Sequence, residues 1–179
     1  MAQSQRTLNE IRQQRREKLD ELRNCGIDPY PYQFKVTHRS GDLPALDDAD
    51  FPDEGSIAGR VVSLRRMGKA SFAHLQDGEG RQQIYLKRDN VGEEAYADLF
   101  GRVDLGDFLG VQGRVFRTRT GEITVEARTV TMLAKSLRPL PNLKEKDGEL
   151  FDPFEDKENR YRRRYLDLIA NPDVKDVFI

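Results

Sequence analysis

The sequence predicts a mainly β (α+β) protein in which a five-stranded barrel follows an N-terminal helix. Apolar residues recur at helical spacing near the start of the chain, whereas from Ser56 onward the hydrophobic pattern alternates with period two. Glycine-containing turns then divide the alternating region into short runs. A chain of 179 residues, 37% hydrophobic and 34% charged, has room for one domain of about 100 to 150 residues and an appendage.

The first predicted element is a helix that begins after Thr7. Thr7 and Glu10 have the spacing of a capping box, and Gly26 with Pro29 ends the helical pattern. The apolar face consists of Leu8, Ile11, Leu19 and Leu22. The other positions carry the basic residues Arg12, Arg15, Arg16, Lys18 and Arg23. These side chains form either the solvated face of a packed helix or a row that contacts the phosphates of a nucleic acid.

Residues 35–54 are predicted to be a connecting loop, because six acidic residues follow Arg39 without a base. Asp47, Asp48 and Asp50 lie close enough in sequence to suggest a metal site. However, neither the glycine turn nor the bidentate glutamate of a calcium loop follows at the required spacing. We therefore predict a solvated loop and no metal ligands.

Five strand-like runs follow, with a short helix predicted at "GEEAYADLFGRV" between the third and the fourth. The runs are "SIAGRVVSLRRM", "SFAHLQD", "RQQIYLKRD", "DFLGVQGRVFRT" and "EITVEARTVTML". Five strands in about 80 residues, with a helix between the third and fourth, have the layout of an OB-fold barrel. Another small antiparallel barrel would show the same alternation, so this alternative stays open.

Alternation also predicts which side chains point away from the barrel core. Because Ala73 and Leu75 suit the core, Phe72 and His74 are expected on the outer face. The same rule places outward the pairs Ser63 and Arg65, Gln83 and Tyr85, and Glu122 and Thr124.

An exposed ring such as Phe72 is a stacking platform for an unpaired base. Glutamine, glutamate and arginine supply hydrogen bonds to base edges and phosphates. Residues 55–138 carry 14 basic against 10 acidic residues, which makes this region mildly positive. The predicted base-contacting set is Arg65, Phe72, Gln83 and Glu122. In the alternative interpretation, Phe72 is covered by the N-terminal helix or lies at the barrel rim.

The composition excludes several classes of site. Cys25 is the only cysteine, so an intrachain disulfide and a thiolate-cluster metal site are excluded, and a reducing compartment is expected. The two histidines and the single cysteine suggest no catalytic constellation. No run approaches the roughly 20 apolar residues that span a bilayer, so we expect a cytoplasmic protein without a membrane partner.

Five motifs, in order, resemble the N-terminal region of bacterial-type class II lysyl-tRNA synthetases. They are "LNEIRQQRREKLDELRNCGIDPYP", "GRVVSLRRMGKASFAHLQD", "LGDFLGVQGRVFRTRTGEITV", "LRPLP" and "RYRRRYLDLI". In that family the OB-fold domain binds the tRNA anticodon, and a C-terminal domain uses ATP and Mg2+ to make lysyl-adenylate. The resemblance implies that the partner is the anticodon stem-loop of tRNA(Lys) and that this chain itself holds no cofactor.

The resemblance also implies roles for single residues. Phe72 matches the ring that stacks on the central anticodon uridine, and Gln83 matches the glutamine that reads this base. Glu122 matches the acid that reads a neighbouring uridine, and Arg65 matches an anticodon-contacting arginine. Arg66 departs from the family pattern, which often has an aliphatic residue there. The candidate contacts to the RNA backbone are Arg12, Arg15, Arg16, Arg66 and Lys69.

The predicted organisation has three parts. Residues 1–54 form the helix and connecting loop, 55–138 the anticodon-binding barrel, and 139–179 a linker and the start of a class II catalytic domain. We expect this chain to be a monomer without ligase activity, whereas the full-length family members dimerise through the catalytic domain. The alternatives are a general single-stranded nucleic-acid-binding OB protein and the equivalent domain of an aspartyl- or asparaginyl-tRNA synthetase, although "LRPLP" and "RYRRRYLDLI" favour lysine.

Overall fold

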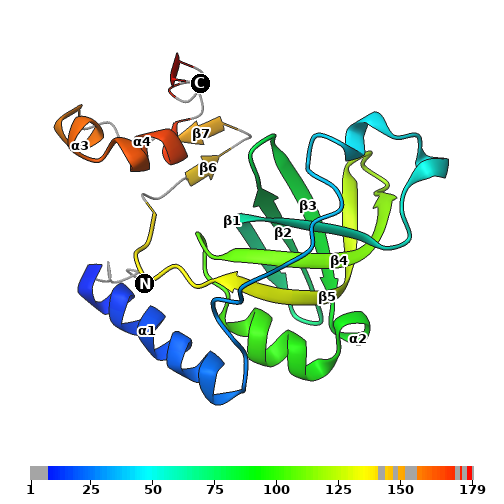
Figure 1. Cartoon of the computed structure of the whole chain (residues 1–179), viewed down its shortest axis with the longest axis horizontal. Coiled ribbons are helices and arrows are strands. Elements are labelled where there is room, and N and C mark those ends of the chain that lie inside the picture. The colour runs from blue at the N-terminus through cyan, green and yellow to red at the C-terminus, as the bar shows by residue number, and fades with distance from the viewer. Residues whose placement is uncertain are drawn as a thin grey trace. The chain divides into compact units, whose positions relative to one another are not determined.

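A computed structural model describes residues 8–140, 144–146, 149–151, 157–171, 174 and 177–178. The chain divides into two compact units, residues 1–137 and 138–179. The first unit contains helix α1 (Leu8–Asn24) and a closed barrel with the strand order β1-β2-β3-β5-β4 (Figure 1). The strands are β1 (Gly55–Met67), β2 (Ala70–Gln76), β3 (Arg81–Lys87), β4 (Phe108–Arg117) and β5 (Ile123–Ala134). The predicted five-stranded barrel preceded by a helix is thus confirmed.

The second unit is small and is described by itself. It contains an antiparallel pair of short strands, β6 (Lys144–Lys146) and β7 (Glu149–Phe151), and the helices α3 (Lys157–Arg162) and α4 (Arg164–Ala170). Within the helices, the buried carboxylate of Asp167 accepts hydrogen bonds from Arg160, Arg164 and Asn171. The assignment of residues 139–179 to a linker and the start of a further domain stays a prediction.

A bulge in β1 decides which of its side chains reach the outer face. Val61 lies opposite Leu75 of β2, but Ser63 lies opposite His74, so the register shifts between Val61 and Ser63. Upstream of the bulge the odd-numbered residues are buried, whereas downstream Arg65 is exposed. Since one extra residue reverses the facing of a strand, the bulge turns Ser63 and Arg65 outward, where the sequence placed them.

The core of the first unit lies inside the barrel and extends under α1. Leu22 of α1 and Leu43 of the connecting loop are fully buried together with strand residues such as Ile84 and Val125. Leu8, which the helical pattern placed on the apolar face, is instead 50% exposed. Helix α1 ends before Gly26, whose φ of 73° suits a residue without a Cβ. Thr7 lies outside the described residues, so the capping box stays a prediction.

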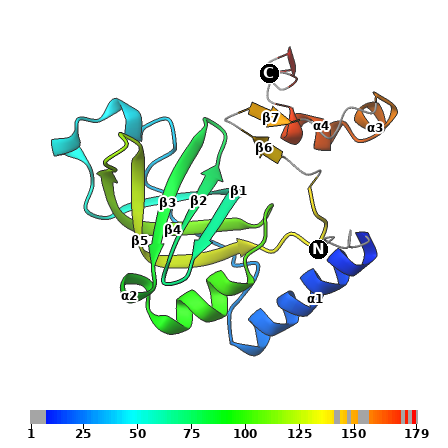
Figure 2. The same ribbon diagram turned by 180° about the vertical axis from the view of Figure 1, so that it is seen from behind.

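The segment between β3 and β4 is helical, as predicted, but consists of three short pieces. These are α2 (Arg88–Val91), a π-helical turn η3 (Ala95–Leu99) and a 3-10 turn η4 (Phe100–Arg102). Figures 1 and 2 show this segment and α1 side by side at one end of the barrel. An ion pair of 2.8 Å between Arg102 Nε and Glu21 Oε2 joins the segment to α1.

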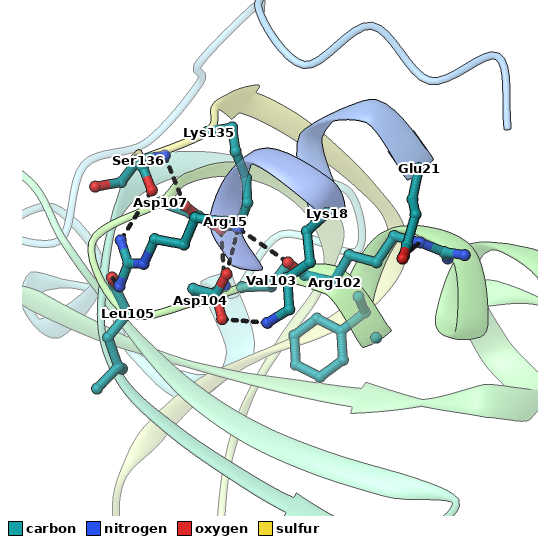
Figure 3. Close-up of polar contacts among 12 residues, drawn as sticks. Arg15, Lys18, Glu21, Arg102, Val103, Asp104, Leu105, Asp107, Lys135 and Ser136 are labelled. Atoms are coloured by element: carbon teal, nitrogen blue, oxygen red, sulfur yellow. Dashed lines mark hydrogen bonds and ion pairs between the residues drawn. The ribbon is translucent and has the colours of Figure 1, made fainter. Parts of the chain in front are cut away.

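A group of charged residues with a buried centre joins α1, the end of β5 and the chain that enters β4 (Figure 3). We call Lys18, Asp104, Asp107 and Lys135 the Lys135 cluster. The Lys135 ammonium donates to Asp107 Oδ2 at 2.6 Å, to Asp104 Oδ2 at 2.7 Å and to the Arg102 carbonyl at 2.9 Å. The side chains of Lys135 and Asp107 are fully buried. Each of the three ammonium protons therefore has an acceptor.

Helix α1 is bound to this cluster through two of its basic residues. Lys18 pairs with the carboxylate of Asp104. Arg15 donates to the carbonyls of Ser136 at 2.8 Å and Leu105 at 2.9 Å. Burial acts to raise the pKa of Asp104, but hydrogen bonds and charges from Lys135 and Lys18 outweigh it, so this pKa lies below its usual value.

The acidic segment before β1 is a loop with two 3-10 turns, η1 (Leu43–Ala45) and η2 (Asp48–Asp50). Its carboxylates pair with arginines of β4 and β5, and Figure 1 shows the loop beside the β4–β5 turn. The pairs are Asp48–Arg117 at 2.8 Å, Asp53–Arg114 at 3.8 Å and Glu54–Arg128 at 3.4 Å. Within the described residues, no helix is both long and apolar enough to cross a membrane.

Candidate nucleic-acid interface

The outer face of the barrel has an open pocket of about 430 Å³ between β1, β2, β3 and the β4–β5 turn. All four residues of the predicted base-contacting set line it, namely Arg65, Phe72, Gln83 and Glu122. The structure adds Ser63, His74 and the turn residues 118–120. The parity rule had placed Ser63 and His74 on this face without giving either a role.

Strand register explains why these residues meet. One cross-strand row consists of Arg65, Phe72 and Tyr85, which lie opposite one another on β1, β2 and β3. The adjacent row contains Ser63, His74, Gln83 and Thr124, the last on β5. Directly opposed residues on antiparallel strands have Cβ atoms about 5 Å apart, so the side chains that β1, β2 and β3 contribute to each row lie next to one another.

Phe72 is half-buried and lies in the pocket, outside the barrel core. The Phe72 and Tyr85 rings have their centroids 4.8 Å apart at an angle of 33°. Tyr85 thus fixes the Phe72 ring from one side. The outward prediction for Phe72 is confirmed, and covering by α1 is not observed. Alternation placed Tyr85 on the same outer face, and the structure shows that the two rings form an adjacent pair.

The Gln83 amide is held in one orientation by its neighbours. Its Nε2 donates to Glu122 Oε2, and its Oε1 accepts from the Thr124 hydroxyl at 2.8 Å. Because a carboxylate only accepts, the amide nitrogen must face Glu122. Thr124 lies opposite Gln83, on the face where alternation placed it, but its side chain is fully buried and its hydroxyl is satisfied by Gln83.

Glu122 is the meeting point of the polar side of the pocket. Its Oε1 accepts from His74 Nε2 at 3.0 Å while its Oε2 binds Gln83. Its backbone is held by Thr118, whose hydroxyl accepts from the Glu122 N–H at 3.0 Å and whose N–H donates to the Glu122 carbonyl at 2.9 Å. We call His74, Gln83, Glu122 and Thr124 the Glu122 cluster. Among the described residues, no group of three or more His, Cys, Asp and Glu side chains is arranged to hold a metal ion.

Two exposed arginines supply positive charge to the pocket. Arg65 and Arg119 line it, and their side chains make no hydrogen bond or ion pair within the part of the chain that the structure describes. Their guanidinium groups can therefore reach a phosphate or a base edge without breaking an internal contact.

Some of the residues proposed to contact the RNA backbone have charged groups without an internal partner, whereas others already bind elsewhere in the protein. Arg16 and Lys69 are exposed, and Arg12 is half-buried with an Nε that has no hydrogen-bond partner among the described residues. Arg66 is exposed, but it donates to the carbonyls of Val103 at 2.8 Å and Phe100 at 3.2 Å. The arginine that replaces the family's usual aliphatic residue at this position is therefore used for an internal contact to the helical segment.

Arg15 differs most from the expectation, because its residue is only 7% exposed and its guanidinium binds two backbone carbonyls. Its partners lie 121 and 90 residues away in sequence, so helical periodicity alone gave no sign of them. The packed-helix interpretation applies to Arg15, and we no longer expect it to contact phosphates.

Comparison with known proteins agrees with this geometry. A tRNA anticodon family model, described as an OB-fold nucleic acid binding domain, matches residues 56–133. The chain is 52% identical to a lysine–tRNA ligase of Pelotomaculum thermopropionicum over 96% of its own length, and 48% identical to one of Porphyromonas gingivalis over 92%. It spans 32% and 30% of the length of these relatives. The chain thus belongs to the lysine–tRNA ligase family over a segment that contains the OB-fold nucleic acid binding domain.

Proposed function

We propose that the chain binds the anticodon stem-loop of tRNA(Lys) and that the pocket reads its unpaired uridines. The observation that carries the proposal is the convergence of a stacking ring, Phe72, with an oriented amide, Gln83, and a carboxylate, Glu122, in one open pocket. Stacking accepts any base, whereas hydrogen bonds to the Watson–Crick edge select among bases.

The role proposed for each polar residue follows from the donors and acceptors that its internal hydrogen bonds leave free. Phe72 stacks on the central base, and the second hydrogen of Gln83 Nε2 donates to a carbonyl oxygen of that base. Glu122 accepts the imino N–H of a neighbouring uridine. Cytidine has an unprotonated ring nitrogen at that position, so its lone pair would face the carboxylate. Arg65 contacts the anticodon as a base-edge or phosphate donor.

Contacts to the RNA backbone are assigned to the basic residues whose charged groups have no internal ion pair among the described residues. Arg12, Arg16 and Lys69 keep this proposed role, because their charged groups make no ion pair within the described residues. Such contacts add affinity without selectivity and weaken as salt concentration rises.

Catalysis is assigned to the part of the relatives that the chain does not match. The relatives are lysine–tRNA ligases about three times as long as this chain. We propose that ATP and Mg2+ use and dimerisation belong to that additional part. The chain alone is expected to bind RNA as a monomer without cofactor and to show neither aminoacylation nor lysine-dependent pyrophosphate exchange.

Titration of the 179-residue chain with three RNA hairpins tests the proposal. The hairpins carry the lysine anticodon, the same loop with cytidine at the central position, and a scrambled loop. We expect the lysine loop to bind at least about tenfold more tightly than the other two, as one or two lost base contacts would imply. Equal affinities would favour a general single-strand binder, which relies on stacking alone.

Two further hairpins distinguish the related synthetases. The aspartate and asparagine anticodons share the central uridine, so they test the neighbouring positions only. Tighter binding of either loop than of the lysine loop would reassign the domain.

A further inference from the structure

His74 has no role in the function proposed above, although it lies at the centre of the pocket face. It occupies β2 between Ser63 of β1 and Gln83 of β3. Its side chain is 31% exposed, and its Nε2 contacts Glu122 Oε1, a residue 48 positions away in sequence. It therefore touches the group that is proposed to read a base.

Glu122 depends on its neighbours for a fixed position. Its side chain is 46% exposed, and an exposed glutamate without partners samples several rotamers. His74 holds one carboxylate oxygen and Gln83 holds the other. The Gln83 bond alone would leave the carboxylate free to rotate about it, whereas two bonds to different oxygens fix its plane.

The contact with Glu122 also determines which imidazole nitrogen of His74 carries a proton. A carboxylate only accepts, so Nε2 of His74 must carry the proton. A carboxylate has roughly four lone-pair positions, of which His74 and Gln83 use one each. The remaining positions can accept the N–H of a base while both internal bonds stay in place.

We propose that His74 is a positioning residue that aims the Glu122 carboxylate at the imino N–H of a uracil base. This inference rests on the proposed function, because it concerns the base that Glu122 reads. His74 acts through Glu122 and leaves the Phe72 stack unchanged.

The test uses the full chain and two hairpins that carry uridine or cytidine at the position assigned to Glu122. His74→Ala is expected to reduce the uridine-to-cytidine affinity ratio about three- to tenfold, the size of one hydrogen-bond contribution. His74→Gln places an amide N–H at a similar distance from the backbone and should restore most of the ratio. His74→Asn, whose amide is one bond shorter, is the matched variant that should not.

A double substitution separates positioning from direct contact. In a Glu122→Ala background, His74→Ala is expected to change the affinity ratio by less than about twofold, because its target is already absent. An undiminished ratio in His74→Ala, or an equal loss for both hairpins that persists without Glu122, would overturn the proposal.

Nitrogen NMR of the free chain tests the same contact without RNA. We expect the neutral His74 ring to carry its proton on Nε2 and this preference to weaken in Glu122→Ala. A ring protonated on Nδ1 alone would refute the positioning contact. If the parent protein shows no uridine preference while the NMR result holds, the proposed function fails and the contact stands.

Discussion

The Lys135 cluster and the Glu122 cluster are both groups of hydrogen-bonded polar side chains, but their central residues differ in access to solvent. The side chains of Lys135 and Asp107 are fully buried, whereas those of His74 and Glu122 are 31% and 46% exposed. The bond lengths in the two clusters are similar. Hydrogen-bond geometry alone therefore does not distinguish a structural cluster from a binding cluster.

Burial explains the difference in role. When a buried ion loses its partner, water cannot replace that partner. The Lys135 cluster therefore stabilises the fold only while all of its charged residues are present. Groups at the pocket can exchange a protein partner for water or for a base at low cost. The Lys135 cluster thus holds α1 and the end of β5 on the barrel, whereas the Glu122 cluster has the accessibility that its proposed role in binding RNA requires.

The largest effect is expected from Lys135→Met. The substitution leaves Asp104 and Asp107 without their shared cation and should lower the free energy of unfolding by about 3–5 kcal/mol. Urea unfolding of the chain measures this change. Lys87→Met is the control, because the Lys87 side chain is 45% exposed and its ion pair spans 3.7 Å. Equal stability of the two variants would show that the buried cluster is dispensable.

In contrast to Lys135→Met, Phe72→Ala should weaken RNA binding more than it lowers the stability of the fold. We expect the lysine anticodon hairpin to bind about 1–3 kcal/mol more weakly, since one base loses its stacking partner. The fold should lose only about 1 kcal/mol, from the contact with Tyr85. Fluorescence titration and thermal unfolding measure the two changes.

Tyr32→Ala is the matched control for Phe72→Ala, because Tyr32 is a fully exposed ring outside the pocket. It should alter neither quantity. A Phe72→Ala protein that unfolds, or that binds as well as the parent, would contradict the assignment of this ring.

The lowered pKa of Asp104 predicts a pH dependence of stability. A carboxyl group with a lower pKa in the folded than in the unfolded state contributes stability above the unfolded value, near 3.9, and loses it as pH falls through the folded value. The stability difference between the parent and Asp104→Asn should therefore shrink below about pH 4. Unfolding at several pH values measures it, with Asp50→Asn as an exposed control. A stability difference between the parent and Asp104→Asn that does not change with pH would count against the contacts of Asp104 with Lys135 and Lys18.

The smallest effect is expected from Arg16→Ala. Removing one exposed cation should weaken all hairpins about equally and reduce the slope of log K against log salt by about one. Arg15→Ala is the contrast, because it should destabilise the fold by about 1–3 kcal/mol through two lost hydrogen bonds. If Arg16→Ala leaves the salt dependence unchanged, α1 serves only in packing.

The period-two hydrophobic pattern of the sequence predicted the barrel and most of its outer face, because alternation within a strand indicates which of its side chains are buried. It placed Phe72, Gln83 and Arg65 correctly, although the bulge after Val61 could not be read from the sequence. It did not predict the burial of polar groups whose partners are distant in sequence. Thr124 faces the side that alternation gave it but is covered and bonded to Gln83, and Arg15 is buried with its guanidinium bonded to two remote carbonyls.

The contact between His74 and Glu122 was missed for the same physical reason. The outward placement of His74 followed from alternation, but its partner Glu122 lies in the turn that precedes β5. Only the register of β2 with β3 and of β3 with β5 brings the two together. Side-chain type and spacing carry no information about such pairing.

A double-substitution cycle on Phe72 and Gln83 tests most directly that one base occupies the pocket. Affinities for the lysine anticodon hairpin are measured for the parent, Phe72→Ala, Gln83→Ala and the combined variant. If a single base touches both side chains, the combined loss should differ from the sum of the single losses by at least about 0.5 kcal/mol. Losses that add within about 0.3 kcal/mol would show that the two residues act on separate parts of the RNA, and the account of the pocket would be wrong.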